Sequence, residues 1–212
     1  MIQYSSNDMA KLGCNACSGC SACCKSMGQS ILLDPYDIYQ IQAATGLGFA
    51  QLMQGQAELH VEEGLILPSL KMQEDTDACG FLDREGRCSI HAYRPGLCRL
   101  FPLGRRYEGD KLWYFVLEDA CQVQNRTKVK IKKWLDVKSL TDYERFLVLW
   151  HDLRRRIQEQ ILERRSDTYA QKINVDMLQI FYQTPYDVAV DFYSQFRERM
   201  GQMESVSLDI IL

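Results

Sequence analysis

The second half of the chain shows the clearest pattern of polar and hydrophobic positions. Residues 141–144 (TDYE) have the spacing of a capping box, in which a hydroxyl and a carboxylate bond to the free amides at a helix start. Behind this start, apolar residues recur at helical intervals. We expect them to form one buried face of a long helix: Phe146, Leu149, Trp150, Leu153, Ile157 and Ile161.

A second helix is predicted further along the chain. It should open at Thr184 with a proline behind it, place Val188, Phe192 and Phe196 inward, and end at Gly201. An apolar stripe at helical spacing is typical of core packing, so neither helix is assigned a chemical role.

The first half of the chain predicts shorter elements. Asp34 and Pro35 suit a helix start and Gly46 suits its end, and a second short helix should follow at 49–53. Residues 57–61 and 65–72 flank a Glu-Glu-Gly turn, and the apolar stretch that ends at Val116 follows a Glu-Gly-Asp turn. Each of these patterns predicts a β-hairpin. Pro68 places its strand at the edge of a sheet.

The two halves differ in composition as well as in pattern. Every cysteine and 12 of the 13 glycines precede residue 125, and long helical pattern follows. We therefore predict an α+β fold with two parts. Residues 1–125 should form a small, irregular, cysteine-rich metal-binding unit of short helices and hairpins, and residues 126–212 a helical region packed on it.

Overall composition excludes several classes of protein. Of 212 residues, 46% are hydrophobic and 25% charged, which is typical of an ordinary globular domain. A net charge of −3 argues against a nucleic-acid partner, and no run approaches the roughly 18 apolar residues of a membrane span. The start of the sequence has no basic stretch followed by an apolar one, so we predict no signal peptide and a cytoplasmic protein. Composition does not exclude binding to a protein partner.

Cysteine usage is the unusual feature. Five of the nine cysteines fall within eleven residues: Cys14, Cys17, Cys20, Cys23 and Cys24. In a reducing compartment such crowded thiols indicate ligands rather than disulfides. Side chains at every third position turn by about 300° per step on a helix, so a loop must bring them together. The spacing resembles a ferredoxin cluster loop, and zinc would accept it equally.

The other four cysteines are candidates for distant ligands. Cys79 and Cys88 flank a predicted turn at 83–87, Cys98 follows Pro95 in a predicted helical turn, and Cys121 ends the next hairpin. Two alternatives stay open at this point. These cysteines can be buried apolar fillers, or the C-x-x-C units can form a redox dithiol, although the βαβ context typical of that motif is missing.

The spacing of these residues also resembles a known family. Residues 17–24 (CSGCSACC), 79–82 (CGFL) and 88–102 (CSIHAYRPGLCRLFP) are similar to the signature of the YkgJ-like cysteine-cluster family, a zinc- or iron-chelating CxxCxxCC domain also found in flagellin lysine N-methylase. The resemblance spans about residues 17–121. It implies a metal centre, iron–sulfur or zinc, with this ligand set: Cys17, Cys20, Cys23, Cys24, Cys79, Cys88, Cys98 and Cys121.

Two departures from the family pattern bear on the ligand count. Cys14 is an extra thiol ahead of the signature, and Ser21 stands where many members have glycine. The eight cysteines can fill two four-ligand sites, or four of them can fill one. Whether Cys14 joins either arrangement stays open.

Two arginines and a histidine lie beside the second half of the signature. Arg94 and Arg99 can lower thiolate pKa values and donate to sulfur, or they can order the loop through a salt bridge or by stacking. His91 can replace a thiol as ligand, but a packing or solvent role is favoured. His60 and His151 have no cysteine near them in sequence and receive no role.

Three functional hypotheses follow. The first is a metal-binding protein that holds an iron–sulfur cluster or zinc through cysteine thiolates, in a redox or accessory role. The second is a protein-lysine N-methyltransferase of the flagellin type, or a component of one, although no glycine-rich donor-binding loop is present. The third is a structural zinc module for protein interaction, in which an arginine-rich stretch at 154–165 is read as a solvated helix face. Enzymatic activity is left undecided.

Overall fold

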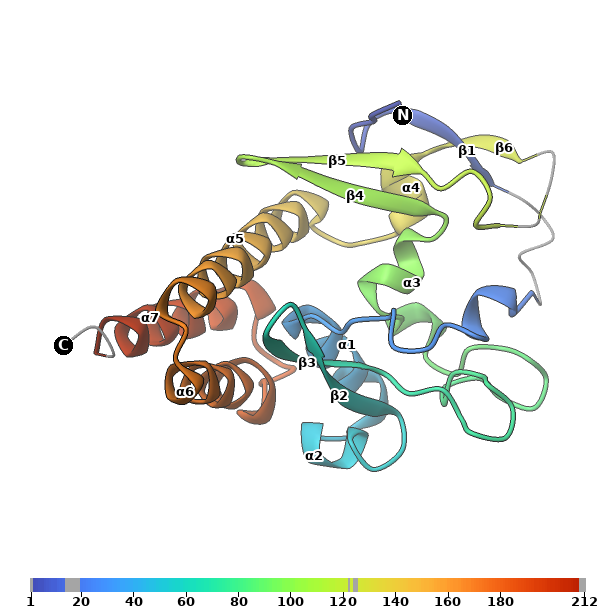
Figure 1. Cartoon of the computed structure of the whole chain (residues 1–212). Coiled ribbons are helices and arrows are strands. Elements are labelled where there is room, and N and C mark those ends of the chain that lie inside the picture. The colour runs from blue at the N-terminus through green and yellow to red at the C-terminus, as the bar shows by residue number, and fades with distance from the viewer. Residues whose placement is uncertain (1, 14–19, 122, 124–125, 210–212) are drawn as a thin grey trace.

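The fold combines short β-hairpins with helices, as the sequence predicts. A computed structural model describes residues 2–13, 20–121, 123 and 126–209 (Figure 1). The strands are β1 (Met9–Gly13), β2 (Ala57–Glu62), β3 (Leu65–Leu70), β4 (Leu103–Glu108), β5 (Lys111–Val116) and β6 (Thr127–Lys130). The helices are α1 (Pro35–Thr45), α2 (Phe49–Leu52), α3 (Gly96–Leu100), α4 (Ile131–Leu135), α5 (Leu140–Arg164), α6 (Asp167–Leu178) and α7 (Phe192–Asp209). Two 3-10 helices, η2 (Ala22–Cys24) and η3 (His91–Tyr93), and a π-helix, η4 (Gln179–Gln183), complete the described elements.

The described strands form three antiparallel pairs. The two predicted hairpins are confirmed as β2–β3 and β4–β5. Their turns use residues with positive φ, including Gly64 at 84° and Gly109 at 59°. The third pair, β1–β6, joins Met9 to Lys130 and was not predicted, because no local turn connects two strands so far apart in sequence.

Local capping chemistry sets the bounds of α1. Asp34 accepts a hydrogen bond from the amide of Asp37 at 2.9 Å, and Asp37 accepts one from the amide of Asp34 at 3.0 Å. This reciprocal capping box satisfies two amides that the helix itself leaves free. Gly46 ends the helix in the left-handed conformation. The predicted short helix at 49–53 is also present as α2.

Helix α5 begins differently from the prediction. Its N-cap is Ser139, with no capping hydrogen bond from the side chain, so the pattern at 141–144 does not act as a capping box. Phe146 and Trp150 are buried as expected, but Leu149 is 38% exposed. Successive residues turn by about 100° on a helix, which places Leu149 at the margin of the buried stripe.

The predicted start of the last helix is wrong. Residues 184–191 are not helical, and α7 begins at Phe192 and continues through Gly201. Val188 is 47% exposed instead of facing inward. The buried guanidinium of Arg199 explains the difference. It donates to the backbone carbonyls of Thr184 and Pro185 at 2.9 and 2.8 Å and so holds this segment in a non-helical turn.

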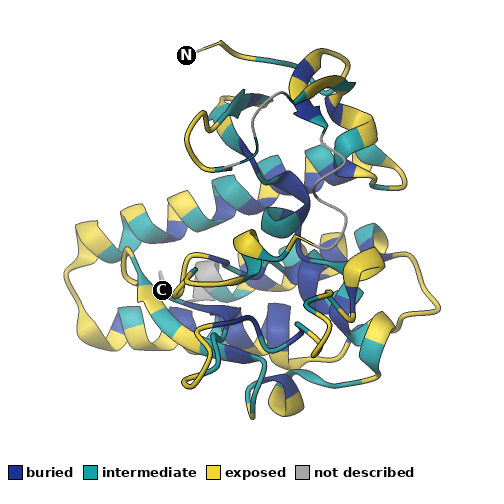
Figure 2. Ribbon diagram, turned by 90° about the vertical axis from the view of Figure 1, so that its right-hand side faces the viewer, coloured by how far each residue is buried: buried dark blue, intermediate teal, exposed yellow. Residues whose placement is uncertain are grey.

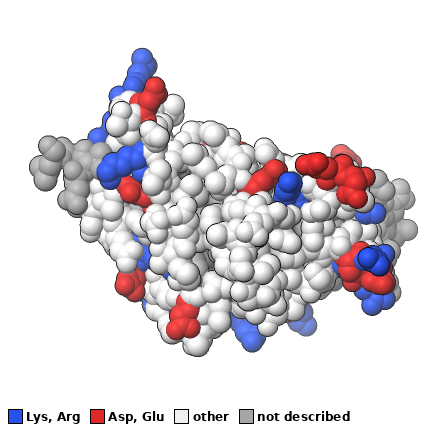
Figure 3. Space-filling model, turned by 90° about the horizontal axis from the view of Figure 1, so that it is seen from below, with Lys and Arg blue, Asp and Glu red and all other residues white. Residues whose placement is uncertain are grey.

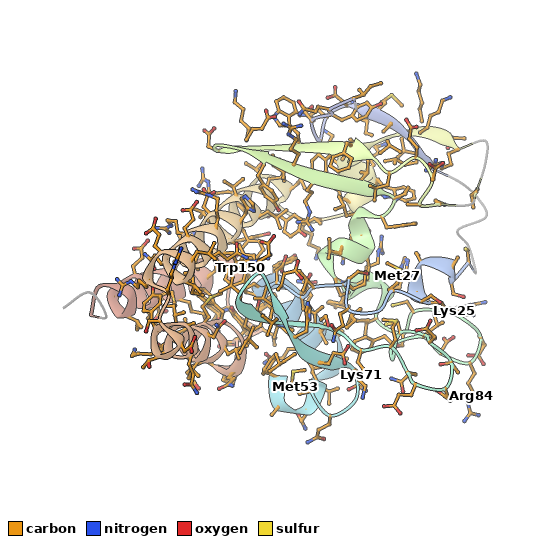
Figure 4. All side chains as sticks on the ribbon, in the orientation of Figure 1. Lys25, Met27, Met53, Lys71, Arg84 and Trp150 are labelled. Carbon is orange, nitrogen blue, oxygen red and sulfur yellow. The ribbon has the colours of Figure 1, made fainter. Side chains whose placement is uncertain are left out.

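The main hydrophobic core is shared between the two halves of the sequence. It joins residues of α1, β2 and β3 to the buried faces of α5, α6 and α7. Aromatic rings fill its centre: Trp150 meets Phe181 edge-on at 5.0 Å, and Phe146 meets Phe196 at 4.8 Å. Figure 2 shows the inward helix faces buried and the outward faces exposed, and Figure 4 shows Trp150 on α5. The division at residue 125 remains a prediction.

A second, smaller core lies under the β4–β5 hairpin. It contains Leu12 of β1, Leu103 of β4, Tyr114 of β5 and Ile131 of α4. Leu97 of α3 packs against both cores, so α3 is fixed between them. This short helix carries Cys98.

Within the described residues, no helix combines the length and the apolar character needed to cross a bilayer. From below, charged side chains lie mainly toward the rim of the molecule, and much of the middle is uncharged (Figure 3).

Candidate metal centre

Cys23 and Cys24 lie in η2, a single 3-10 turn. The amide of Cys24 donates to the carbonyl of Ser21 at 2.9 Å, and the amide of Lys25 donates to that of Ala22 at 3.3 Å. Small residues at 21 and 22 let the backbone turn this tightly. In Figure 4, Lys25 and Met27 mark the segment that leaves η2.

The main chain ties this segment to the middle of the sequence. The amide of Cys79 donates to the carbonyl of Cys24 at 2.8 Å, and the amide of Ser26 donates to the carbonyl of Asp77 at 2.8 Å. Lys25 and Ala78 form the antiparallel bridge between these two bonds. Two cysteines 55 positions apart are therefore neighbours through backbone hydrogen bonds.

Cys79 and Cys88 are joined by the predicted turn. Leu82 and Cys88 form an antiparallel bridge, and the amide of Leu82 donates to the carbonyl of Cys79 at 2.9 Å. Asp83 closes the turn by accepting the amide of Arg87 at 2.7 Å. Burial raises the pKa of both thiols, and backbone hydrogen bonds from Phe81 and Ile90 to their sulfurs offset part of this rise.

Cys98 lies on α3, in the helical turn predicted after Pro95. The amide of Gly96 donates to Oδ1 of Asp37 at 2.7 Å, which links the start of α3 to the first turn of α1. Asp37 is buried, and this desolvation, with the charge of Asp34 next, raises its pKa well above the usual range. Sequence reasoning missed Asp37. Its spacing of three from Asp34 was the available signal.

Five thiols act on one another electrostatically: Cys23, Cys24, Cys79, Cys88 and Cys98, here called the thiol cluster. They come from four segments of the chain, two of which are joined directly by the backbone hydrogen bond from Cys79 to Cys24. Within the described part of the chain, however, no group of three or more Cys, His, Asp or Glu side chains has an arrangement that would hold a metal ion. The donor chemistry fits zinc or iron. The described sulfurs alone do not complete a site.

The environment divides the thiols into two kinds. A hydrogen bond from Cys24, assisted by the charge of Arg94, lowers the pKa of Cys23 to about 6. Donating that bond raises the pKa of Cys24. Burial raises the pKa of Cys98, where the charge of Asp37 adds to the effect. The pKa of Cys23 is therefore lowered, whereas those of Cys24 and Cys98 are raised.

The other predicted ligands are not joined to the thiol cluster in this way. Cys20 is exposed just before η2. Cys121 follows β5, and no described interaction connects it to the other cysteines. Cys14 and Cys17 lie outside the described residues. The ligand roles of all eight predicted cysteines, those of the thiol cluster included, remain predictions, and the role of Cys14 stays open.

The two arginines have different surroundings. Arg99 is 6% exposed and donates to the backbone carbonyls of Arg94 at 3.0 Å, of Asp136 at 3.2 Å and of Ala92. It orders the loop before α3 through backbone carbonyls rather than by stacking on a ring. Arg94 interacts electrostatically with Cys23, Cys88 and Cys98, so it is the cation beside the thiol cluster.

The histidines contribute no described ligand group. Nδ1 of His91 lies 3.2 Å from the guanidinium of Arg94, and burial together with that charge lowers the pKa of His91. His151 stacks on Tyr107 with ring centroids 3.9 Å apart. His60 lies 3.6 Å from Glu62.

Thiols gathered from four segments, on a scaffold of hairpins and helices, are the features of a cysteine-rich chelating domain. Comparison with protein families identifies it: residues 16–134 match the CxxCxxCC family, described as a zinc- or iron-chelating domain, and the chain belongs to this family. Comparisons with curated proteins and with solved structures give no match.

Proposed function

We propose that the protein holds an iron–sulfur cluster through the thiol cluster and the neighbouring signature cysteines Cys17 and Cys20, in a redox or accessory role. The convergence of five thiols from four segments is the observation that carries the proposal. Family membership supports the coarser statement that the domain chelates zinc or iron. Backbone amides that donate to the sulfurs of Cys79 and Cys88 would stabilise thiolate charge in either kind of centre.

The alternative of a structural zinc module uses the same donors. A zinc site needs about four ligands, and the chain offers more thiols than one such site uses. Metal and sulfide analysis of protein purified without oxygen separates the two. We expect brown protein with iron and acid-labile sulfide. Colourless protein with stoichiometric zinc would refute the iron–sulfur cluster and support the structural zinc module.

A pair of matched variants tests the ligand assignment. Cys98→Ser removes a member of the thiol cluster, and Cys14→Ser removes the extra thiol ahead of the family signature. We expect Cys98→Ser to lose iron and sulfide while keeping its helical circular dichroism, because Cys98 is only partly buried against the main core and serine is close to cysteine in size. Cys14→Ser should keep more of both. Equal loss in the two variants would show that the centre is larger than the thiol cluster.

Metal binding should strengthen as pH rises. Burial holds protons on Cys79, Cys88 and Cys98, and a metal must displace them to bind thiolates. Zinc competition with a chromophoric chelator at several pH values measures this proton release. An affinity independent of pH would argue against buried thiols as ligands.

The methyltransferase alternative has less support. Each sheet in the described part of the chain is a two-stranded antiparallel pair, and these pairs do not form the parallel sheet on which dinucleotide-type donor sites are built. Equilibrium dialysis with a labelled sulfonium methyl donor tests this. We expect no binding, and stoichiometric binding would revive the alternative.

A further inference from the structure

The β2–β3 hairpin has one edge that the rest of the protein covers. Along β3, the carbonyl of Pro68 accepts the amide of Leu33 at 2.8 Å. Further along the same edge, the amide of Ile66 donates to Oδ1 of Asn174, on α6, at 2.6 Å. The outward groups of β3 are thus bonded to other parts of the chain.

These bonds fix the direction of the backbone groups on β2. In an antiparallel pair, directly opposed residues point their N–H and C=O groups either both toward the neighbouring strand or both away. Pro68 opposes Leu59, and Ile66 opposes Val61. Because Pro68 and Ile66 point away from β2, Leu59 and Val61 point their backbone groups away from β3.

The outward edge of β2 is open. No described residue bonds to the backbone N–H or C=O of Leu59 or Val61. The two residues are 43% and 67% exposed, although both are apolar. Exposed apolar residues on an unpaired strand edge are typical of a surface that accepts another strand.

The opposite face of the same strand is acidic. Glu58, His60 and Glu62 alternate with Leu59 and Val61. The only charged neighbour found for these carboxylates in the described residues is His60, 3.6 Å from Glu62. An added strand would therefore meet apolar side chains on one face and the carboxylates of Glu58 and Glu62 on the other.

We infer that the open edge of β2 binds an extended segment of a partner protein in which apolar residues alternate with lysine or arginine. The segment would add a third strand to the β2–β3 hairpin and bond to the four free backbone groups of Leu59 and Val61. Its apolar residues would lie beside those two side chains. Its cations would lie beside Glu58 and Glu62, and opposite charges across a strand pair are stabilising.

A second copy of the chain fits this edge less well. Two antiparallel β2 strands would bond the free backbone groups of Leu59 and Val61 when Leu59 of each copy lies opposite Val61 of the other. That register also sets Glu58 opposite Glu62 twice, and like charges directly opposed are destabilising. Charge complementarity thus favours a basic segment over self-association.

A labelled peptide tests the inference. The probe is fluorescein-Lys-Val-Lys-Val-Lys-Val-Lys, and its binding is followed by fluorescence anisotropy. We expect saturable binding with a Kd below about 1 mM, weakened by salt. The control peptide has the same side chains but N-methylated valines. It should bind at least roughly tenfold more weakly, because it cannot donate to β2. Equal binding of both peptides would show that only charge attraction holds them, and it would overturn the inference. Absence of binding by the first peptide would overturn it as well.

Variants locate the site on the protein. Val61→Pro removes one outward N–H without breaking the ladder to β3, since that N–H takes no part in it. We expect it to weaken binding by roughly tenfold, whereas Val61→Thr, which keeps the N–H, should stay within about twofold. Glu58→Gln with Glu62→Gln should weaken binding and reduce its salt dependence. Concentration-dependent dimerisation that Val61→Pro abolishes would assign the edge to a second copy and contradict the inference.

Discussion

Replacing Asp37 tests whether a single carboxylate connects α1 to the helix that carries Cys98. In Asp37→Ala, the capping box of α1 loses one of its two bonds, which typically costs about 1 kcal/mol. The amide of Gly96 loses its acceptor in a buried place, which costs about 1–3 kcal/mol more. The expected loss of unfolding free energy is therefore about 2–4 kcal/mol.

Asp37→Asn separates these contributions. Asparagine keeps an oxygen for the amide of Gly96 but presents an NH₂ group where Asp34 donates, and it removes the cost of burying a charge. We expect a loss of less than about 2 kcal/mol. Asp167→Ala is the matched control, because Asp167 occupies the first turn of α6 and is exposed. Its loss should be at most about 1 kcal/mol.

Urea unfolding measures the unfolding free energy of the three variants, and the comparison holds when the dependence of that free energy on urea concentration is the same in each. Metal content is recorded in parallel. The reasoning predicts that Asp37→Ala loses most stability and also retains metal least well, since α3 is released from α1. If Asp37→Ala cost no more than Asp167→Ala, the link between α1 and α3 would carry no stability and the argument would be refuted.

Three further changes test other parts of the structure. Trp150→Ala should lower the unfolding free energy by about 3–5 kcal/mol, because it opens a cavity among the aromatic rings. Leu149→Ala, at the exposed margin, should lower it by less than about 1 kcal/mol. Comparable losses of unfolding free energy in urea would mean that the buried face of α5 is misplaced. Arg99→Ala should cost about 2–4 kcal/mol, because it leaves backbone carbonyls without donors, and a melting temperature within about 2 °C of the parent protein would contradict this. Burial raises the pKa of Asp34 from 3.8 to about 6, so the stability that its protonated form provides is fully present below pH 3.8 and is lost as pH rises to about 6. Asp34→Asn should remove that loss, and identical pH profiles of unfolding free energy for the two proteins would show that Asp34 does not titrate in this range.

Elements whose signals are local could be predicted from the sequence. Helix α1 is set by Asp34, Pro35 and Gly46, and each acts within a few residues of its own position. The two hairpins are set by their turns in the same way. In contrast, β1–β6 joins a strand near the start of the chain to one at 127–130, within the part predicted to be helical. Short strands of mixed polarity carry too little pattern to show that pairing.

A tertiary contact explains the error at the start of the last helix. A threonine followed by proline is typical of a helix start, but the bonds from Arg199 to the carbonyls of Thr184 and Pro185 override that preference. At the candidate site, the turn between Cys79 and Cys88 was predictable because it is local. The backbone pairing of Cys24 with Cys79 was not predictable, because neither segment has a sequence feature that specifies which other segment it pairs with.

The bond from the amide of Cys79 to the carbonyl of Cys24 also bears on how the centre would be assembled. Bringing two distant stretches of chain together normally costs conformational entropy at the moment an ion is captured. Here the two stretches are already paired through the backbone of the folded protein, so the protein without its metal would keep them in register. A protein that lost its iron and sulfide would then keep this pairing, and rebuilding the centre would not require the polypeptide to fold again.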